Sequence, residues 1–171
     1  MANTLYLCVS LDGLIATSNR ESEWPENAWA TWCGFCTSAD NLIVGRVTYS
    51  ELTQTDVSDI LYPKHKIVIS SQELDLADSW LQFSSPREAV DYLKSCDVDN
   101  IIVGGGQKTA LAFILEKLID EIILDVQPVL FGNGTPLLGE LEEVIDLELI
   151  TSKSLGHDAI RMHYKIRKTR I

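Results

Sequence analysis

The chain has 171 residues, of which 46% are hydrophobic, and this is enough for one domain with its own apolar core. Its 14 basic and 25 acidic residues give a formal net charge of −11, which argues against a basic groove for nucleic acid. The N-terminus lacks a basic segment followed by an apolar core, and no run has the length of a membrane span. We therefore expect a cytoplasmic protein, a single domain over residues 1–171, that binds neither nucleic acid nor membranes.

Four cysteines, Cys8, Cys33, Cys36 and Cys96, are expected to be thiols in that compartment. Cys33 and Cys36 have the C-x-x-C spacing, which in other proteins marks redox or zinc chemistry. Here the spacing lies in a segment with helical periodicity, and no second pair of Cys or His follows at zinc spacing. We interpret the pair as two small residues on a buried helix face, and we predict no metal site.

Residues 4–10 alternate and are rich in β-formers, so we predict a first strand that ends at Asp12 and Gly13. The segment 14–25 that follows is polar, with Ser, Asn and Glu. We expect it to be a mobile loop, and loops of this length at a strand end often cover a site.

A helix is predicted over 26–37, because Trp29, Trp32 and the two cysteines of the C-x-x-C recur at spacings of three and four. Such an apolar stripe usually belongs to the core. The same tryptophans are also suited to the floor of a substrate pocket, and both interpretations stay open.

A second strand is predicted over 41–44, and it ends in Gly45, Arg46 and Thr48 before a helix that begins near Tyr49. A glycine at a strand end allows close approach of a ligand, and the basic and hydroxyl side chains suit phosphate oxygens. The alternative is structural, with Thr48 as a helix cap and Arg46 in a surface ion pair.

A third strand is predicted over 66–69 and ends in Ser70 and Ser71. Their hydroxyls can meet a phosphate, although capping of the next turn is the commoner role. A short strand over 80–83 and a helix that starts at Pro86 and ends near residue 95 follow.

The next strand, residues 101–103, runs into the glycines of positions 104–106 and then into a helical pattern from Thr109. Glycines permit positive φ angles, and the helix start offers unpaired N–H groups and the positive end of its dipole. Lys108 adds a charge there. A tight turn without a ligand is the alternative, because neither the spacing of the common dinucleotide fold nor a phosphate loop is present.

A longer strand is predicted over 120–127, with Ile122, Leu124 and Val126 on one face and Ile123, Asp125 and Gln127 on the other. A carboxylate within an apolar strand points either to a functional role or to an exposed sheet face or edge. Two further strands, 144–152 and 159–167, are expected to close the chain as an antiparallel hairpin through Gly156.

Strands that alternate with helices and end in consecutive strands predict a three-layer α/β domain with a mostly parallel sheet and an antiparallel edge. Ligands in such sheets lie at the carboxyl ends of the strands. Asp12, Gly45, Ser70 and Gly104 all fall at such ends.

The ordering resembles the dihydrofolate-reductase-like superfamily and, within it, stand-alone relatives of the C-terminal reductase domain of bifunctional riboflavin-biosynthesis (RibD) proteins. The likeness covers nearly the whole chain. It rests on SLDGLIA at 10–16, GRVTY at 45–49, VGGG at 103–106 and IDEIILDVQPVLFGNGTPLL at 119–138. The resemblance implies a three-layer αβα fold, NADPH as cofactor, and hydride transfer to a small pteridine- or pyrimidine-like substrate.

Carried over by position, the resemblance also implies which residues meet the cofactor and a cis peptide in the double-glycine turn. Ile15 and Ala16 would meet the nicotinamide, and Ser70 and Ser71 the adenosine ribose and its phosphate. The remaining phosphates would lie against Gly45, Arg46, Thr48, Gly104, Gly105 and Gly106, with Gln107 and Lys108 at the start of the next helix.

The part of the chain that would bind the substrate departs from the patterns of both the dihydrofolate reductases and the riboflavin-pathway reductases. The first helix reads WPENAWATW, with Trp29 near the place where dihydrofolate reductases carry a carboxylate, and no Arg occurs between Arg46 and Arg87. The expected pocket is lined by Tyr6, Cys8, Asp12, Trp29 and Asp125. Asp125 and Asp12 are the candidate catalytic residues, with Asp125 as the candidate proton donor.

Three functions stay open from the sequence. They are a reductase with an unidentified substrate, a 5-amino-6-(5-phosphoribosylamino)uracil reductase-type enzyme of the riboflavin pathway, and a non-catalytic dinucleotide-binding or assembly domain. The resemblance also implies a homodimer formed through the antiparallel edge.

Overall fold

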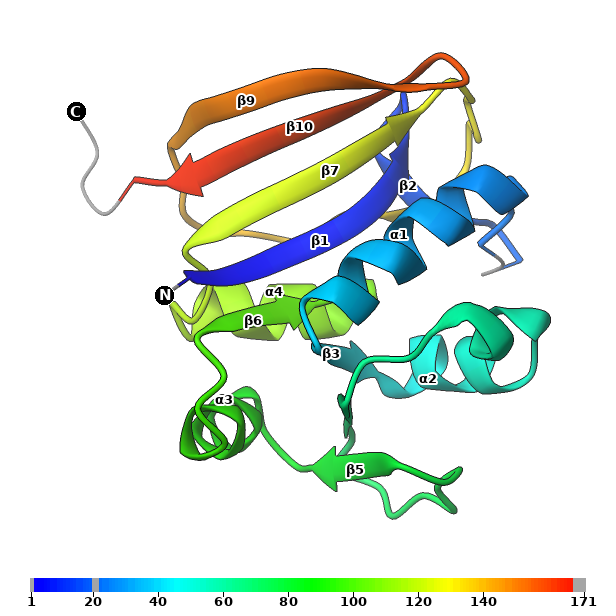
Figure 1. The fold of residues 1–171 in the computed structure, drawn as a ribbon. Coiled ribbons are helices and arrows are strands. Elements are labelled where there is room, and N and C mark those ends of the chain that lie inside the picture. The colour runs from blue at the N-terminus through cyan, green and yellow to red at the C-terminus, as the bar shows by residue number, and fades with distance from the viewer. Residues whose placement is uncertain (1, 20–21, 168–171) are drawn as a thin grey trace.

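A computed structural model of the chain describes residues 2–19 and 22–167 (Figure 1). The helices are α1 (Glu26–Ser38), α2 (Arg46–Thr53), α3 (Pro86–Ser95) and α4 (Gln107–Leu115), with a 3-10 turn, η1 (Asp56–Ile60). The strands are β1 (Ala2–Ser10), β2 (Leu14–Thr17), β3 (Asn41–Gly45), β4 (His65–Ile69), β5 (Trp80–Phe83), β6 (Asn100–Val103), β7 (Glu121–Gln127), β8 (Gly134–Pro136), β9 (Leu147–Gly156) and β10 (Ala159–Ile166).

One eight-stranded sheet has the order β5-β4-β3-β6-β1-β7-β10-β9. The strands from β5 to β7 are parallel to their neighbours, whereas β10 runs antiparallel to β7 and β9 antiparallel to β10. This confirms the predicted mostly parallel sheet with an antiparallel C-terminal edge. The bounds of the predicted elements differ from the observed ones by a few residues, the largest differences being the start of α2 and both ends of β9.

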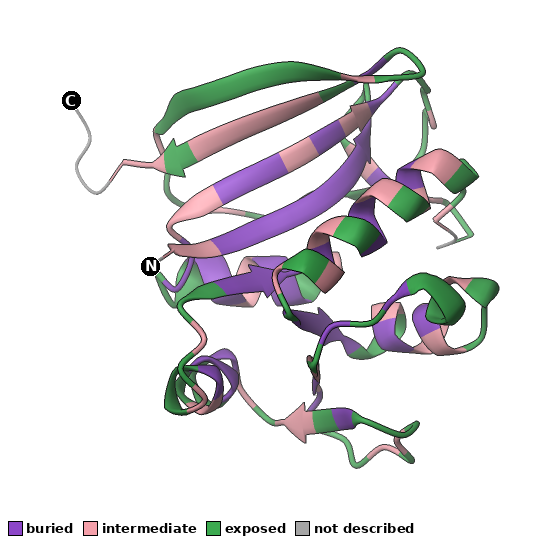
Figure 2. Cartoon of the chain, in the orientation of Figure 1, coloured by how far each residue is buried: buried purple, intermediate pink, exposed green. Residues whose placement is uncertain are grey.

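Helices cover both faces of the sheet. On one face α1 and α2 pack against side chains that include Tyr6 and Val44, and on the other α3 and α4 pack against side chains that include Leu5 and Ile43. Figure 2 shows β1 buried along most of its length and β9 exposed along nearly all of its length. The core therefore lies around the middle of the sheet, and the antiparallel edge is bare.

Alternation along β7 follows the predicted pattern. Ile122, Leu124 and Val126 pack in the cluster on the α3–α4 side, and Ile123 packs on the α1 side. Asp125 lies on the α1 side with 1% of its surface exposed. The alternative of an exposed face or edge for this carboxylate is therefore wrong.

The segment expected to be a mobile loop contains a strand. Leu14–Thr17 forms β2, which pairs antiparallel with β8. Positions 20–21 of the same segment lie outside the described residues. A Cβ atom built on Gly134 of β8 would lie 2.1 Å from the carbonyl oxygen of Ala16. The pairing of β2 with β8 therefore depends on glycine at this position, because a Cβ atom there would overlap backbone atoms of β2.

Two local predictions about helices are confirmed. Helix α3 begins at Pro86, as predicted, and Ser85 caps it by accepting a hydrogen bond from the backbone N–H of Glu88. Cys33 and Cys36 are buried on α1 as free thiols. Among residues 2–19 and 22–167, no helix has the length and apolar character that crossing a bilayer requires.

Candidate active site

The two glycine junctions that the sequence singled out lie side by side. Gly45, at the end of β3, donates its backbone N–H to the carbonyl oxygen of Gly105 at 2.7 Å. A Cβ atom on Gly45 would lie 2.2 Å from Oγ1 of Thr109, a buried side chain of α4. Only glycine allows the start of α4 to approach the end of β3 this closely.

Gly106 continues the junction and is joined to Gly105 by a cis peptide bond, as predicted. A Cβ atom on Gly106 would lie 3.3 Å from Oγ1 of Thr48 and 3.9 Å from Cδ1 of Ile15. The structure thus brings three separately predicted site residues together, Gly106 after β6, Thr48 of α2 and Ile15 of β2.

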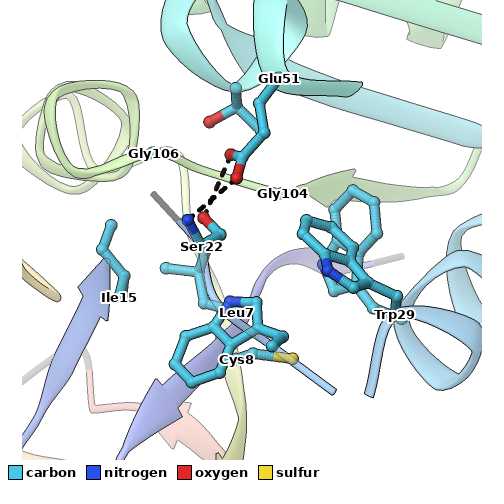
Figure 3. Close-up of a pocket in the computed structure, with 11 residues that line it drawn as sticks. Leu7, Cys8, Ile15, Ser22, Trp29, Glu51, Gly104 and Gly106 are labelled. Carbon is cyan, nitrogen blue, oxygen red and sulfur yellow. Dashed lines mark hydrogen bonds between the residues drawn. The ribbon is translucent and has the colours of Figure 1, made fainter. Parts of the chain in front are cut away.

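A pocket opens beside these glycines, with a volume of about 410 Å³ that includes its open mouth (Figure 3). We refer to it as the tryptophan pocket. It is lined by Leu7, Cys8, Ile15, Ser22, Trp24, Trp29, Trp32, Thr48, Glu51, Gly104 and Gly106.

Aromatic side chains form one wall of the tryptophan pocket. Trp29 and Trp32 of α1 meet edge to face, with ring centroids 6.0 Å apart. Trp32 is buried and directs its indole N–H at the carbonyl oxygen of Tyr6 at 3.3 Å, so this ring is fixed. Trp24 stacks near Phe131 at 5.1 Å between centroids. The tryptophans that the sequence left between core and pocket therefore serve both.

Glu51 and Ser22 line the pocket as well, and the sequence analysis missed both. The backbone N–H of Ser22 donates to Oε1 of Glu51 at 3.0 Å, and its hydroxyl donates to Oε2 at 3.1 Å (Figure 3). Glu51 follows Thr48 by three positions on α2, so the two share a helix face. That spacing from the GRVTY segment is the signal that could have identified Glu51.

Cys8 lies in the wall of this pocket, as predicted, and it is buried. Burial, followed by the charge of Asp125, raises the pKa of the Cys8 thiol. The thiol is therefore neutral at physiological pH and acts as a small apolar surface.

Tyr6 and Asp125 do not line the tryptophan pocket. The Tyr6 hydroxyl donates to Oδ2 of Asp125 at 2.6 Å, and Arg161 of β10 binds both carboxylate oxygens at 2.7 Å. The guanidinium also contacts the Tyr6 hydroxyl and lies 4.9 Å from its ring centroid. Burial, with the negative charge of Asp125, raises the pKa of Tyr6. This closed cluster favours a structural role for Asp125 over proton donation.

Asp12 is exposed at the end of β1 and is outside the tryptophan pocket. It accepts from the Ser10 hydroxyl at 2.6 Å and from the backbone N–H groups of Phe131 and Gly132 at 3.2 and 2.7 Å. These bonds, that of Ser10 foremost, hold the pKa of Asp12 below its ordinary value. Asp12 thus fixes the loop that carries Phe131.

The remaining residues predicted to meet the cofactor lie on β2, at the starts of α2 and α4, or directly after β4. Ser70 is bonded within its own turn, where its hydroxyl donates to the carbonyl oxygen of Gln72 at 2.8 Å, which agrees with the capping alternative. Of the other predicted residues, Ala16 is buried and Gln107 is half-buried. The remaining three are exposed to solvent, and they are Arg46, Ser71 and Lys108.

Comparison with known proteins identifies the family. A family model described as the RibD C-terminal domain matches residues 4–160. The chain belongs to this family. "Uncharacterized protein YwjB" of Bacillus subtilis (strain 168) is similar to this RibD C-terminal domain, with 30% identity over 166 residues that cover 94% of the chain and 95% of the relative.

Solved structures agree with that assignment. A protein of Shewanella sp. PV-4, provisionally assigned to riboflavin biosynthesis, is similar with a TM-score of 0.81 and 25% identity, covering 98% of this chain and 100% of that one. A Thermotoga maritima diaminohydroxyphosphoribosylaminopyrimidine deaminase/5-amino-6-(5-phosphoribosylamino)uracil reductase shares the fold, with a TM-score of 0.73, 13% identity, and coverage of 97% and 56%. This RibD C-terminal domain therefore has the dihydrofolate-reductase-like fold of the riboflavin-pathway reductases.

Proposed function

We propose that this RibD C-terminal domain is an NADPH-dependent reductase that transfers hydride to a small heterocycle bound in the tryptophan pocket. The proposal is carried by one observation, the junction at which Gly45 and Gly105 are bonded at 2.7 Å beside that pocket. When bound, NADPH would supply the hydride. The chain itself would bind the cofactor and the substrate, orient them toward each other, and exclude water from the reacting atoms.

The residues around the junction suit a dinucleotide phosphate. Helices α2 and α4 both begin there, and the first N–H groups of a helix have no partner within it. The missing Cβ atom of Gly106 has only Thr48 at 3.3 Å and Ile15 at 3.9 Å beside it, so the backbone there is the least covered part of the turn, and Thr48 adds a hydroxyl. Exposed Arg46 and Lys108 stand at the two helix starts, where they would bind phosphate oxygens.

The substrate would lie between this junction and the aromatic wall. Ile15 and Gly106 line the pocket on the side of the junction, and Trp29 and Trp32 line it on the side of α1. A planar substrate held against these rings would face the cofactor at a fixed distance, which is the main contribution a protein makes to hydride transfer. The apolar wall would also keep water from the reacting atoms.

Titration of NADPH and NADH against the purified protein tests the cofactor, with nucleotide fluorescence as the readout. We expect micromolar binding that prefers NADPH and that weakens by roughly 10-fold in Arg46→Ala, the typical loss of one charge-assisted hydrogen bond. Arg87→Ala, an exposed arginine on α3, is the matched control and should bind like the wild type. Absence of binding by either nucleotide would contradict the proposal.

Turnover separates the reductase from a non-catalytic dinucleotide-binding domain. We expect NADPH oxidation with at least one member of a panel of pyrimidines and pteridines. The panel includes 5-amino-6-(5-phosphoribosylamino)uracil, which the Thermotoga maritima protein is named for reducing. Tight NADPH binding without oxidation by any member would favour the non-catalytic domain.

A further inference from the structure

We propose that the uncovered face of the hairpin β9–β10 binds a phosphate group through Arg161, Lys153 and Thr151. The site lies away from the tryptophan pocket and does not depend on the proposed function. It is drawn from the unused N–H groups of Arg161, the register of the two strands and the distribution of charge around them.

A second cavity lies on the α1 side of the sheet, and we refer to it as the edge groove. Its volume is about 1940 Å³ including its open mouth, and it extends from the end of α1 and the start of β4 across to β10 and β9. Among the described residues, none lines both this groove and the tryptophan pocket. In Figure 1, α1 lies along β1, and no helix lies in front of β10 or β9. This part of the sheet face is therefore open to a ligand.

Arg161 uses only part of its guanidinium within the fold. Nε and Nη2 bind the two carboxylate oxygens of Asp125, each at 2.7 Å, and Nη2 also contacts the Tyr6 hydroxyl. Nη1 lies at the far edge of this side-on pair, and nothing in residues 2–19 and 22–167 accepts a hydrogen bond from it. No buried side-chain nitrogen of the described residues lacks a partner, so Nη1 is exposed to the groove that Arg161 lines. Its two N–H groups are available to an acceptor.

The register of the hairpin places a second cation beside Arg161. Lys153 of β9 lies directly opposite Arg161 of β10. Thr151 lies opposite His163, two positions further along both strands. Side chains in opposite positions share a face, with Cβ atoms roughly 5 Å apart, and these four all line the edge groove. Like charges in opposite positions repel, so an anion between Arg161 and Lys153 would remove a destabilising contact.

The carboxylates that line the edge groove do not occupy this position. Asp97 and Asp99 precede β6, which is three strands from β10 or roughly 14 Å away, and Asp40 precedes β3, one strand further. Exposed charges are largely screened beyond roughly 8 Å at physiological salt. Glu121 is bonded to Nε2 of His163 at 2.7 Å. The local field at the hairpin is therefore set by the hairpin's own side chains and their direct partners.

The charge and the donors of this face suit a phosphate group. Asp125 balances the charge of Arg161, whereas Lys153 is exposed and has no ion-pair partner among the described residues, so one positive charge is uncompensated. Guanidinium N–H groups, an ammonium group and the exposed hydroxyl of Thr151 all donate hydrogen bonds, and phosphate oxygens accept them. The rest of the groove has room for the organic part of a phosphate ester.

Amide NMR spectra of the full chain, titrated with inorganic phosphate and with ribose 5-phosphate, test the site. We expect the amides of residues 151–153 and 161–163 to shift with a dissociation constant of about 1 mM, the affinity that a few charge-assisted hydrogen bonds provide. Tighter binding of ribose 5-phosphate would identify an ester as the ligand, and equal binding would identify the free ion. Ribose without phosphate should leave these amides unmoved, and a shift with ribose would overturn the proposal.

Lys153→Met should weaken the binding roughly 10-fold, because it removes the uncompensated charge, and Lys153→Arg should retain most of the affinity. Lys64→Met is the matched control. Lys64 is an exposed lysine of the same groove, directly before β4 and so five strands from β10, and its variant should bind like the wild type. Equal losses in the two methionine variants, or no shift on β9 and β10 in the wild type, would overturn the proposal.

The readout separates this site from the glycine junction of the proposed function. Arg46→Ala should leave the shifts on β9 and β10 unchanged, and Lys153→Met should leave the binding of NADPH unchanged. Phosphate shifts confined to residues 45–48 and 104–108 would place the ion at the junction alone and contradict the site on the hairpin. Arg161 is kept in every variant, because its loss would leave Asp125 buried without its cation.

Discussion

Arg161 joins the last strand to the middle of the sheet through side chains alone. Its guanidinium is 11% exposed and its partner Asp125 only 1%, with the Tyr6 hydroxyl as the third member of the cluster. Such a buried network stabilises the fold only while it is complete, because each member is costly when left alone. It therefore fixes β10 against β7 and β1 more than it serves chemistry.

Arg161→Met should lower the free energy of unfolding by about 3–5 kcal/mol, because it leaves the Asp125 carboxylate buried without its cation. Urea denaturation measures the effect. Arg87→Met is the control, since Arg87 is an exposed arginine on α3 and the same change there should alter stability by less than about 0.5 kcal/mol. Similar losses in the two variants would show that the cluster contributes little.

Asp12 gives a pH dependence of known sign. Its pKa is lowered in the folded protein, so the stabilisation it provides is present above pH 3.8, the ordinary pKa of the group, and is lost as the pH falls through the folded pKa. Below pH 3.8 we expect the loop of Phe131 and Gly132 to loosen, and the emission of Trp24, which stacks near Phe131, to change. Asp12→Asn should show no such step, and an identical step in this variant would assign it to another group.

Among the elements, β2 and β8 depend most on a contact between distant parts of the chain. Gly134→Ala places a methyl group against the carbonyl of Ala16, and the clash is with backbone on both sides. We expect a loss of about 1–3 kcal/mol in the free energy of unfolding, as for other forced overpacking.

Gly34→Ala is the matched control for that change. Gly34 lies within α1, and a Cβ atom there meets nothing within 4 Å. Alanine should therefore stabilise the protein by roughly 0.5–1 kcal/mol through helix propensity. Thermal unfolding of the two variants should shift in opposite directions, and a shared direction would contradict the contact of β8 with β2.

Sequence periodicity predicted most of these elements because each carries its own local signal. The β-branched runs of β3, β6 and β7, and the cap and proline of α3, are examples. β2 was missed because its four residues, which lie among polar neighbours, form a strand only by pairing with the distant residues Gly134–Pro136. Ser22 was missed for the same reason, since nothing near it in the sequence indicates that it meets Glu51, whereas Glu51 does have a local signal in its spacing from Thr48 on α2.

At the scale of the molecule, β9 is an uncovered edge. All its residues but Leu155 are exposed, and apolar side chains continue across it onto β10, with Leu149 54% and Ile160 49% exposed. A bare edge of this length is a template for pairing, and two identical edges can close as a two-fold dimer. We propose that a second copy of the chain covers it.

Sedimentation equilibrium should therefore give twice the 19.1 kDa mass of one chain. Leu149→Lys should return the protein to a monomer at micromolar concentration, because it places a charge on the apolar patch. Lys94→Ala is the control, because Lys94 lies on the last turn of α3, a helix that packs against β4 and β5 at the opposite end of the sheet from β9. A monomeric wild type would contradict the dimer.

The position of β1 also determines when the protein is able to fold. β1 pairs with β6 and β7, so its partners lie in residues 100–127. The centre of the sheet cannot form while those residues are still within the ribosome, and until then the most apolar strand of the N-terminus has no partner. High contact order of this kind slows folding and prolongs exposure to aggregation, so a newly made chain of this protein would benefit from a chaperone that holds its first strand.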